Sequence, residues 1–231
     1  MWLAPLVALV AAAGGHEWAR LCRLASPAAL LYAIAVAIAF GGIFAFGEPA
    51  AVRLAFVAAA AFWVLVVPIW LRRGVNPEPR LALVAAGFVV LVPAALALAE
   101  LPPASVLEVL VLVWVADTAA YFVGRAWGRR KLAPAISPSK TWEGAWGGIA
   151  GAVAYAIIGG TFLKGVGAWP VYAGVAVVLG AISIVGDLFE SAAKRQAGVK
   201  DSGTLLPGHG GILDRVDSAS AVLPIAALLL S

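Results

Sequence analysis

The sequence is poor in the residues that soluble and metal-cluster proteins depend on. It has a single cysteine, Cys22, in 231 residues, so an internal disulfide and a cysteine-based metal cluster are excluded. Charged residues make up 12% of the chain, about half the share found in an average soluble domain. Only two histidines occur, and they form no zinc-binding motif. With so few polar side chains, the chain cannot cover a water-exposed surface.

Apolar residues dominate instead. They make up 63% of the sequence, and the mean hydropathy is +1.00, which excludes intrinsic disorder. Apolar stretches long enough to cross a bilayer are 27–47, 54–71, 81–99, 105–124, 144–163 and 169–190, and shorter ones are 2–13 and 218–231. We therefore expect an all-α, polytopic membrane bundle of about seven to nine transmembrane helices.

Basic residues alternate along the chain. Fourteen of the 16 lysines and arginines fall in the segments 14–26, 72–80, 125–143 and 191–217. The intervening segments keep only Arg53 and Lys164. Because loops rich in Lys and Arg stay in the cytoplasm, this pattern predicts that the two large basic loops, 125–143 and 191–217, are cytoplasmic and that both chain ends lie on the opposite side.

Two aspartates lie inside the predicted spans or at their ends. Asp117 lies within 105–124, and Asp187 lies near the cytoplasmic end of 169–190. An acidic side chain at such a depth is costly and usually functional. The alternative for each aspartate is a buried salt bridge to a loop arginine.

The two large loops combine carboxylates, cations and small hydroxyl residues, a mixture suited to phosphate. Mg²⁺ prefers carboxylate oxygens and commonly bridges protein to phosphate, and Asp187 and Asp214 are the best ligand pair. Neighbouring lysines and arginines would neutralise other phosphate oxygens. Ser137, Thr141 and the backbone N–H groups of the glycine-rich turn at 208–211 would add donors.

His209 lies in that glycine-rich turn, Gly208-His209-Gly210-Gly211. It is a hydrogen-bonded turn residue, a phosphate contact or an acid–base group, and the sequence leaves all three roles open. The turn is not a dinucleotide-binding glycine motif, and the chain contains no P-loop.

The second loop carries a dense polar pattern over residues 191–217. It reads Ser191-x2-Lys194-Arg195-x4-Lys200-Asp201-x-Gly203-x3-Pro207-x-His209-Gly210-Gly211-Ile212-x-Asp214-Arg215-Val216-Asp217. The first loop reads Asp117-Thr118-x2-Tyr121-Phe122-x-Gly124-Arg125 and then Ile136-Ser137-Pro138-x-Lys140-Thr141-Trp142-Glu143-Gly144. Together these segments resemble the signature of the phosphatidate cytidylyltransferase (CDP-diacylglycerol synthase) family.

The resemblance implies an activity in phospholipid biosynthesis. The phosphate of phosphatidic acid would attack CTP and give CDP-diacylglycerol and pyrophosphate. It also implies Mg²⁺ held by Asp187 and Asp214, with a potassium ion beside it. The expected partners are CTP, phosphatidic acid, membrane lipids and a second copy of the chain, with no nucleic acid. The expected location is the inner (plasma) membrane, with the active site facing the cytoplasm.

The residue types and the resemblance together suggest roles for individual residues. Residues 1–104 would form N-terminal transmembrane helices and 105–231 the catalytic region of one membrane domain. The expected catalytic residues are Asp187, Asp214, Lys194, Arg195, Lys200 and Arg215. The expected contacts to substrate phosphates are Lys131, Ser137, Lys140, Thr141, Ser191, His209, Gly210 and Gly211. Additional ligands, or partners of the arginines, are Asp117, Asp217, Arg125, Glu143 and Asp201.

Three other functions compete with this interpretation. A CTP-dependent polyprenol kinase or an ether-lipid synthase would handle phosphates similarly, but a kinase leaves CDP rather than pyrophosphate. A CDP-alcohol phosphatidyltransferase is disfavoured because its aspartate pattern is absent. A transporter would use Asp117 and Asp187 as an ion path, but polar residues would then recur at mid-membrane depth on several spans.

Overall fold

The computed structural model describes residues 3–75, 80–159, 169–203 and 210–230. These ranges form nine α-helices, one π-helical turn and one two-stranded sheet. The N-terminal elements are α1 (Leu3–Leu21), α2 (Ser26–Phe46), α3 (Pro49–Ala61), η1 (Phe62–Val66), α4 (Val67–Arg72) and α5 (Arg80–Glu100). They are followed by α6 (Pro103–Trp127), β1 (Lys131–Ala133), β2 (Ser137–Thr141), α7 (Trp142–Gly159), α8 (Trp169–Ala197) and α9 (Leu213–Leu230).

Five helical segments are long and apolar enough to cross a membrane. They are Ser26–Phe46, Pro49–Arg72, Arg80–Glu100, Pro103–Trp127 and Pro170–Ala197. The predicted class, a mainly helical membrane protein, is therefore confirmed, whereas the count of seven to nine spans stays a prediction. α1, α7 and α9 have 19, 18 and 18 residues, and polar residues occupy part of each.

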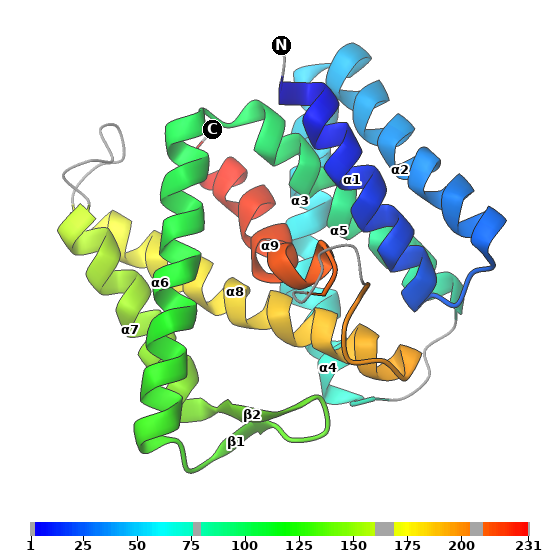
Figure 1. The fold of residues 1–231 in the computed structure, drawn as a ribbon. Coiled ribbons are helices and arrows are strands. Elements are labelled where there is room, and N and C mark those ends of the chain that lie inside the picture. Colours follow the sequence, from blue (N-terminus) through cyan, green and yellow to red (C-terminus); the bar gives the residue numbers. More distant parts are fainter. Residues whose placement is uncertain (1–2, 76–79, 160–168, 204–209, 231) are drawn as a thin grey trace.

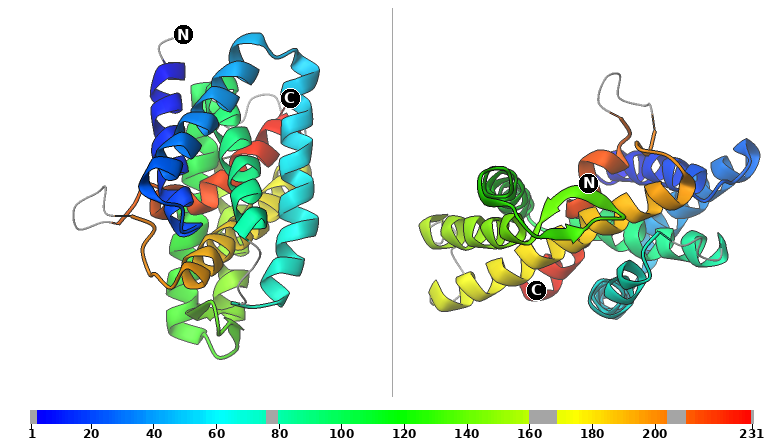
Figure 2. Two further views of the ribbon diagram at one scale, coloured as in Figure 1. Left: turned by 90° about the vertical axis from the view of Figure 1, so that its right-hand side faces the viewer. Right: turned by 90° about the horizontal axis from the view of Figure 1, so that it is seen from below.

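The helices form two groups joined by α8 and α9 (Figure 1). α6 packs along α7 on one side, and α1 packs along α2 on the other. α8 crosses obliquely between the groups and contacts α7, α9 and α4. The β1–β2 hairpin lies at one end of the molecule, beneath α8, and the first turn of α1 lies toward the opposite end (Figure 2).

An aromatic cluster fixes α8 against the N-terminal helices. The Phe189 ring is 1% exposed and contacts four other rings at centroid distances of 5.3 to 5.9 Å. These are the rings of Trp18, Phe62, Trp63 and Trp70. Because edge-to-face and offset rings pack in defined orientations, the cluster sets the rotation of α8 where the site residues lie.

A π-helical turn brings two of these rings into place. In η1 the Val67 N–H donates to the Phe62 carbonyl, five residues earlier. Pro68 follows and has no N–H to donate, which weakens the ordinary helical pattern at this point. The inserted residue turns the following α4 so that Trp63 and Trp70 both face Phe189.

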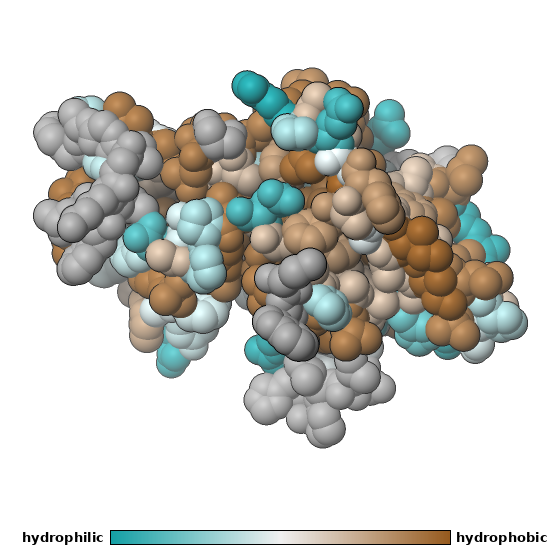
Figure 3. All heavy atoms as spheres, turned by 90° about the horizontal axis from the view of Figure 1, so that it is seen from above, coloured by the Kyte–Doolittle hydropathy of each residue, from teal (hydrophilic) through white to brown (hydrophobic). Residues whose placement is uncertain are grey.

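The outer surface of the molecule suits lipid. Seen from above, apolar residues cover most of the visible face, and hydrophilic residues form separate patches (Figure 3). Large exposed apolar side chains include Leu31, Ile38, Leu54 and Ile158. In water such exposure would be costly, so it agrees with a bundle whose sides contact hydrocarbon.

Three local features differ from the sequence prediction. The loop 125–143 contains an antiparallel hairpin in which Lys131 pairs with Thr141, a strand too short and polar to be recognised. The segment 14–26 is mostly helical, because α1 continues to Leu21. The loop 191–217 is helical at both ends, because α8 runs to Ala197 and α9 starts at Leu213.

Candidate active site

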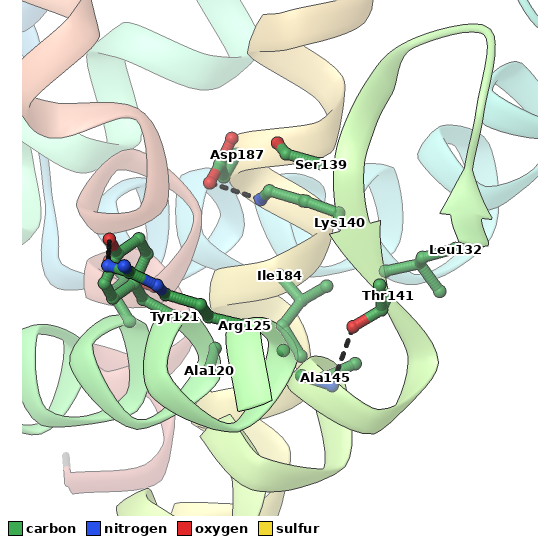
Figure 4. Close-up of a pocket in the computed structure, with 13 residues that line it drawn as sticks. Ala120, Tyr121, Arg125, Leu132, Ser139, Lys140, Thr141, Ala145, Ile184 and Asp187 are labelled. Carbon is green, nitrogen blue, oxygen red and sulfur yellow. Dashed lines mark hydrogen bonds and ion pairs between the residues drawn. The ribbon is translucent and has the colours of Figure 1, made fainter. Parts of the chain in front are cut away.

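A cavity of about 470 Å³ lies between α6, the hairpin, α7 and α8. Its wall draws on residues 117–125 of α6, residues 132–145 and residues 184–187 of α8 (Figure 4). The first large loop therefore meets α8 just before the second loop begins, and the described residues of 191–217 lie outside this wall. The charged and hydroxyl side chains in the wall are Asp117, Tyr121, Arg125, Ser139, Lys140, Thr141 and Asp187. Ala120, Ala145 and Ile184 make part of the wall apolar.

Asp187 and Lys140 face each other across this cavity (Figure 4). Lys140 Nζ forms an ion pair with Asp187 Oδ2, and Ser191 Oγ donates to Asp187 Oδ1 at 3.3 Å. The Lys140 and Asp187 side chains are 26% and 27% exposed. Because the pair stays open to the cavity, each partner is accessible to a charged substrate.

Asp117, on α6, adds a second carboxylate to the wall. Its Oδ1 accepts a hydrogen bond of 3.5 Å from the hydroxyl of Ser183, which is fully buried in α8. Asp117 also interacts electrostatically with Asp187 and Lys140. The wall therefore carries two carboxylates, Asp117 and Asp187, beside the cations Lys140 and Arg125.

α9 brings Asp217 to the same place. A Cβ built at Gly186 would lie 3.0 Å from the Asp217 carbonyl oxygen and 2.8 Å from Ala221 Cβ, so α8 and α9 cross in close contact beside Asp187. Asp217 interacts electrostatically with Asp187, Asp117 and Lys140. Three carboxylates and one lysine thus share one region.

Asp214 lies in a different part of the α8–α9 interface. Lys194 Nζ contacts Asp214 Oδ1 at 2.7 Å and Glu190 Oε2 at 2.8 Å. Asp214 Oδ2 accepts three hydrogen bonds, from the N–H and hydroxyl of Ser202, both at 2.9 Å, and from the N–H of Gly211 at 2.8 Å. The Asp214 carboxylate is therefore surrounded by donors from its own chain.

These donors determine the charge of Asp214. Burial by itself would raise the pKa of the carboxyl, but the hydrogen bonds from Lys194, Gly211 and Ser202 outweigh burial and lower the pKa from 3.8 to about 2. Asp214 therefore stays ionised at neutral pH.

The glycine-rich turn fits closely around this carboxylate. Gly210 has φ +84°, in the left-handed region that glycine adopts readily, and a Cβ there would lie 2.7 Å from Asp214 Oδ2. The Gly211 N–H, predicted as a phosphate donor, is directed at Asp214. His209 and residues 204–208 lie outside the described residues.

Two predicted site residues, Thr141 and Glu143, have structural partners. Thr141 Oγ1 accepts from the Gly144 N–H at 3.1 Å and so caps α7, while Thr141 also lines the cavity. Glu143 accepts from the backbone N–H groups of Arg129 and Arg130, at 3.0 and 3.2 Å. These bonds, that from Arg129 most strongly, lower the pKa of Glu143 and hold α7 against the start of the hairpin.

Among the described residues, Arg125 is the one other predicted cation that lines the cavity. Arg125 Nη1 donates to the Tyr121 hydroxyl at 3.0 Å, and Arg195 Nε donates to the Ile136 carbonyl at 3.5 Å. Lys131 and Ser137 belong to the hairpin, with Lys131 exposed. Lys200, Asp201 and Arg215 are also exposed, outside the cavity wall.

Residues that the sequence interpretation missed lie beside Asp214. Glu17 of α1 and Ser202 are buried and hydrogen-bonded to each other at 3.1 Å. Glu190, 5% exposed in its side chain, binds Lys194. Glu17 lies in a helix that is otherwise nearly free of acids, and that isolation is the signal by which it could have been found.

The full sequence matches the profile of a known family. The match to the cytidylyltransferase family covers residues 1–231. The chain belongs to the cytidylyltransferase family. It is therefore a nucleotidyltransferase, as the sequence predicted.

Curated relatives agree with the family assignment. The chain is 38% identical to a phosphatidate cytidylyltransferase of Pseudomonas aeruginosa, over 99% of this chain and 88% of the relative. It is 50% and 54% identical to proteins of the same name from Haemophilus influenzae and Brucella suis. These two matches cover 51% of this chain and 42% of each relative. The resemblance drawn from the two loops is thus confirmed.

Proposed function

We propose that the chain is a phosphatidate cytidylyltransferase, which transfers a cytidylyl group from CTP to phosphatidate and releases pyrophosphate. The observation that carries this proposal is the cavity in which Asp117, Lys140 and Asp187 meet. Asp117 and Lys140 belong to the first segment that resembles this family's signature, and Asp187 lies four residues before the second. The chain matches the cytidylyltransferase family throughout.

Transfer of a cytidylyl group depends on aligning the two substrates and neutralising the charge of their phosphates, more than on covalent catalysis by the protein. A phosphate monoester has a second pKa of about 6, so the lipid phosphate is already anionic near pH 7 and needs no strong base. An oxygen of that phosphate attacks the α-phosphorus of CTP, and the bond to the β-phosphate oxygen breaks. Lys140 lines the cavity and is placed to contact phosphate oxygens. Lys194 does not line the cavity and is bound to Asp214 and Glu190.

A divalent cation suits the charge of this site. Among the described residues there is no preformed cluster of three or more side chains that would hold a metal by themselves. The three carboxylates nevertheless outnumber the two cations of the site, Lys140 and Arg125, and Mg²⁺ commonly completes its shell with substrate phosphates and water. When bound, the cation would withdraw charge from the phosphates and the leaving pyrophosphate.

The carboxylates differ in how available they are to bind a cation. Asp187 is open to the cavity, and Asp217 lies near it across the α8–α9 crossing. Asp214, the partner expected from the sequence, accepts four hydrogen bonds from its own chain. We therefore assign the cation to Asp187 and Asp217, with Asp117 as a further carboxylate nearby, and give Asp214 the role of holding Lys194. The potassium ion stays a prediction.

The wall of the cavity suits a lipid with an anionic head. Carboxylate and lysine groups lie beside Ala120, Ala145 and Ile184, so polar and apolar surfaces meet in one space. In the proposed arrangement the tails remain in the membrane, and CTP enters from the cytoplasm at the end where the basic hairpin lies. We place the protein in the inner membrane, with both termini on the far side and a second copy as a partner.

Product identity tests this proposal. The purified chain in detergent is given CTP, Mg²⁺ and phosphatidate, and the products are separated by mass. CDP-diacylglycerol and pyrophosphate in equal amounts are expected. Release of CDP with a polyprenol acceptor would make the protein a kinase, and ion flux in proteoliposomes without CTP turnover would make it a transporter.

A further inference from the structure

Glu17 connects the N-terminal helix α1 to the segment that carries the signature residues. Its side chain is buried, with 5% of the residue exposed. Oε1 accepts from the Ile212 N–H at 3.0 Å, and Oε2 accepts from the Leu213 N–H at 2.9 Å. Oε2 also accepts from the Ser202 hydroxyl at 3.1 Å. One carboxylate thus binds three groups located 185 to 196 residues away in the sequence.

These contacts complete the start of α9. The first N–H groups of a helix have no partner within the helix, and an N-cap side chain usually accepts from them. Ile212 precedes α9 and offers no side-chain oxygen. Glu17 supplies the missing acceptors from α1, and its negative charge suits the positive end of the helix dipole.

The surrounding glycines leave room for this carboxylate. A Cβ built at Gly203 would lie 2.7 Å from Glu17 Oε1, and one at Gly211 would overlap Ser202 Oγ and Glu17 Oε2. Neither position is compatible with a real side chain. Two glycines of the signature segment therefore lie against Glu17, and Gly211 also lies against Ser202.

Ser202 extends the connection to the site. Its hydroxyl lies 3.1 Å from Glu17 Oε2 and 2.9 Å from Asp214 Oδ2, although it has one hydrogen to donate. Its backbone N–H also binds Asp214. Contacts therefore run from Glu17 through Ser202 to Asp214, and from Asp214 to Lys194.

We infer that Glu17 is a positioning residue for the proposed transfer reaction. It fixes the start of α9, so that Asp214 holds Lys194 and Asp217 lies close enough to interact electrostatically with Asp187. Glu17 does not line the cavity, so it acts through these residues and not on the substrate. This inference rests on the proposed function, but the contacts of Glu17 do not.

The test compares Glu17→Gln and Ser202→Ala with a matched control. Gln keeps the size of Glu but offers one acceptor oxygen, so at least one backbone N–H loses its partner. Tyr32→Phe is the control, because it removes a buried 2.8 Å hydrogen bond from the Tyr32 hydroxyl to the Val84 carbonyl, between α2 and α5. All three variants are full-length proteins, measured in detergent for thermal unfolding, kcat and the KM for CTP.

We expect Glu17→Gln to lower kcat by about tenfold, because small displacements of positioned groups are costly, with the KM for CTP changed by less than about threefold. Tyr32→Phe should lower the unfolding temperature and leave kcat unchanged. The double variant Glu17→Gln/Ser202→Ala should lose no more kcat than the more affected single variant, because both residues act through one chain of contacts. If the loss of kcat in the double variant equalled the product of the two single-variant losses, the shared chain of contacts would be contradicted. A wild-type kcat in Glu17→Gln would overturn the inference.

A second measurement separates this inference from the proposed function. Limited trypsin digestion reports whether the segment before α9 opens, since Lys200 and Arg215 are exposed on either side of it. Faster cleavage there in Glu17→Gln than in Tyr32→Phe is expected, whatever the reaction is. If the wild-type protein showed no turnover of CTP and phosphatidate, only the proposed function would be overturned. If Glu17→Gln showed the cleavage rate and the kcat of the wild type, only the positioning role would be overturned.

Discussion

Gly186 of α8 lies directly against the backbone of Asp217 in α9. A Cβ added at Gly186 would approach the Asp217 carbonyl oxygen to 3.0 Å and Ala221 Cβ to 2.8 Å. Since Asp187 follows Gly186, this close crossing determines how near the α8 and α9 carboxylates lie. The space between two helices, rather than a loop, therefore sets the geometry of the proposed cation site.

The first prediction concerns Gly186→Ala. The added methyl group should separate α8 from α9, lower turnover strongly and cost about 1–3 kcal/mol of stability. Gly174→Ala is the control in the same helix, because a Cβ at Gly174 meets nothing within 4 Å. Turnover and thermal unfolding of the two variants are compared. Equal activity in both would contradict the role of the crossing.

The second prediction concerns Lys140. Lys140→Ala should raise the KM for CTP more than it lowers kcat, because the lysine lines the cavity and its charge is available to phosphate. Arg53→Ala, an exposed change in α3, should leave both parameters unaltered. Steady-state kinetics with varied CTP provide the measurement. An unchanged KM in Lys140→Ala would remove the residue from nucleotide binding.

The third prediction separates the carboxylates. Asp217→Asn should raise the Mg²⁺ concentration needed for half-maximal turnover, because a proposed ligand loses its charge. Asp214→Asn should instead lower kcat and the unfolding temperature, because its amide nitrogen would face donors of Ser202, Gly211 or Lys194. Glu100→Gln, at the exposed end of α5, is the control. If Asp214→Asn raised the Mg²⁺ concentration for half-maximal turnover more than Asp217→Asn did, Asp214 rather than Asp217 would be the metal ligand.

The fourth prediction concerns pH. The pKa of Asp214 is about 2 in the folded protein and 3.8 ordinarily, so its ionised form stabilises the fold. That contribution is fully present above the ordinary pKa and is lost as the pH falls toward 2. The difference in unfolding temperature between wild type and Asp214→Asn should therefore be constant near neutral pH and shrink below about pH 4. A difference that grows in acid would contradict the assignment.

The sequence predicted the helical membrane class and drew attention to Asp117, Lys140 and Asp187, which line the cavity. It also expected Asp214 and Lys194 in the same site, but these two lie outside the cavity wall. Asp117 and Asp187 could be recognised because an acidic side chain in an apolar helix is energetically costly and usually functional. The hairpin could not be predicted, because Lys131–Ala133 is a strand of 3 residues with no apolar alternation. The role of Glu17 was hidden for a different reason, since its partners lie at 202, 212 and 213 and only folding brings them together.

Asp214 illustrates the same limit within the signature segment. Sequence spacing identifies an acidic residue near cations, which is compatible with a metal ligand or an ion-pair partner. The structure supplies four donors to its two oxygens, and that local saturation favours the ion pair. Whether Asp214 is a metal ligand or an ion-pair partner depends on the directions of nearby backbone N–H groups, which cannot be read from the amino-acid types.

The most direct test of the account follows two labels of CTP in one experiment. CTP carrying one isotope at the α-phosphate and another at the γ-phosphate is incubated with phosphatidate and the purified wild-type chain, Asp187→Asn or Glu100→Gln. The account predicts that the α label enters the lipid and the γ label leaves as pyrophosphate, in wild type and Glu100→Gln but not in Asp187→Asn. Entry of the γ label into the lipid, or wild-type transfer by Asp187→Asn, would contradict it.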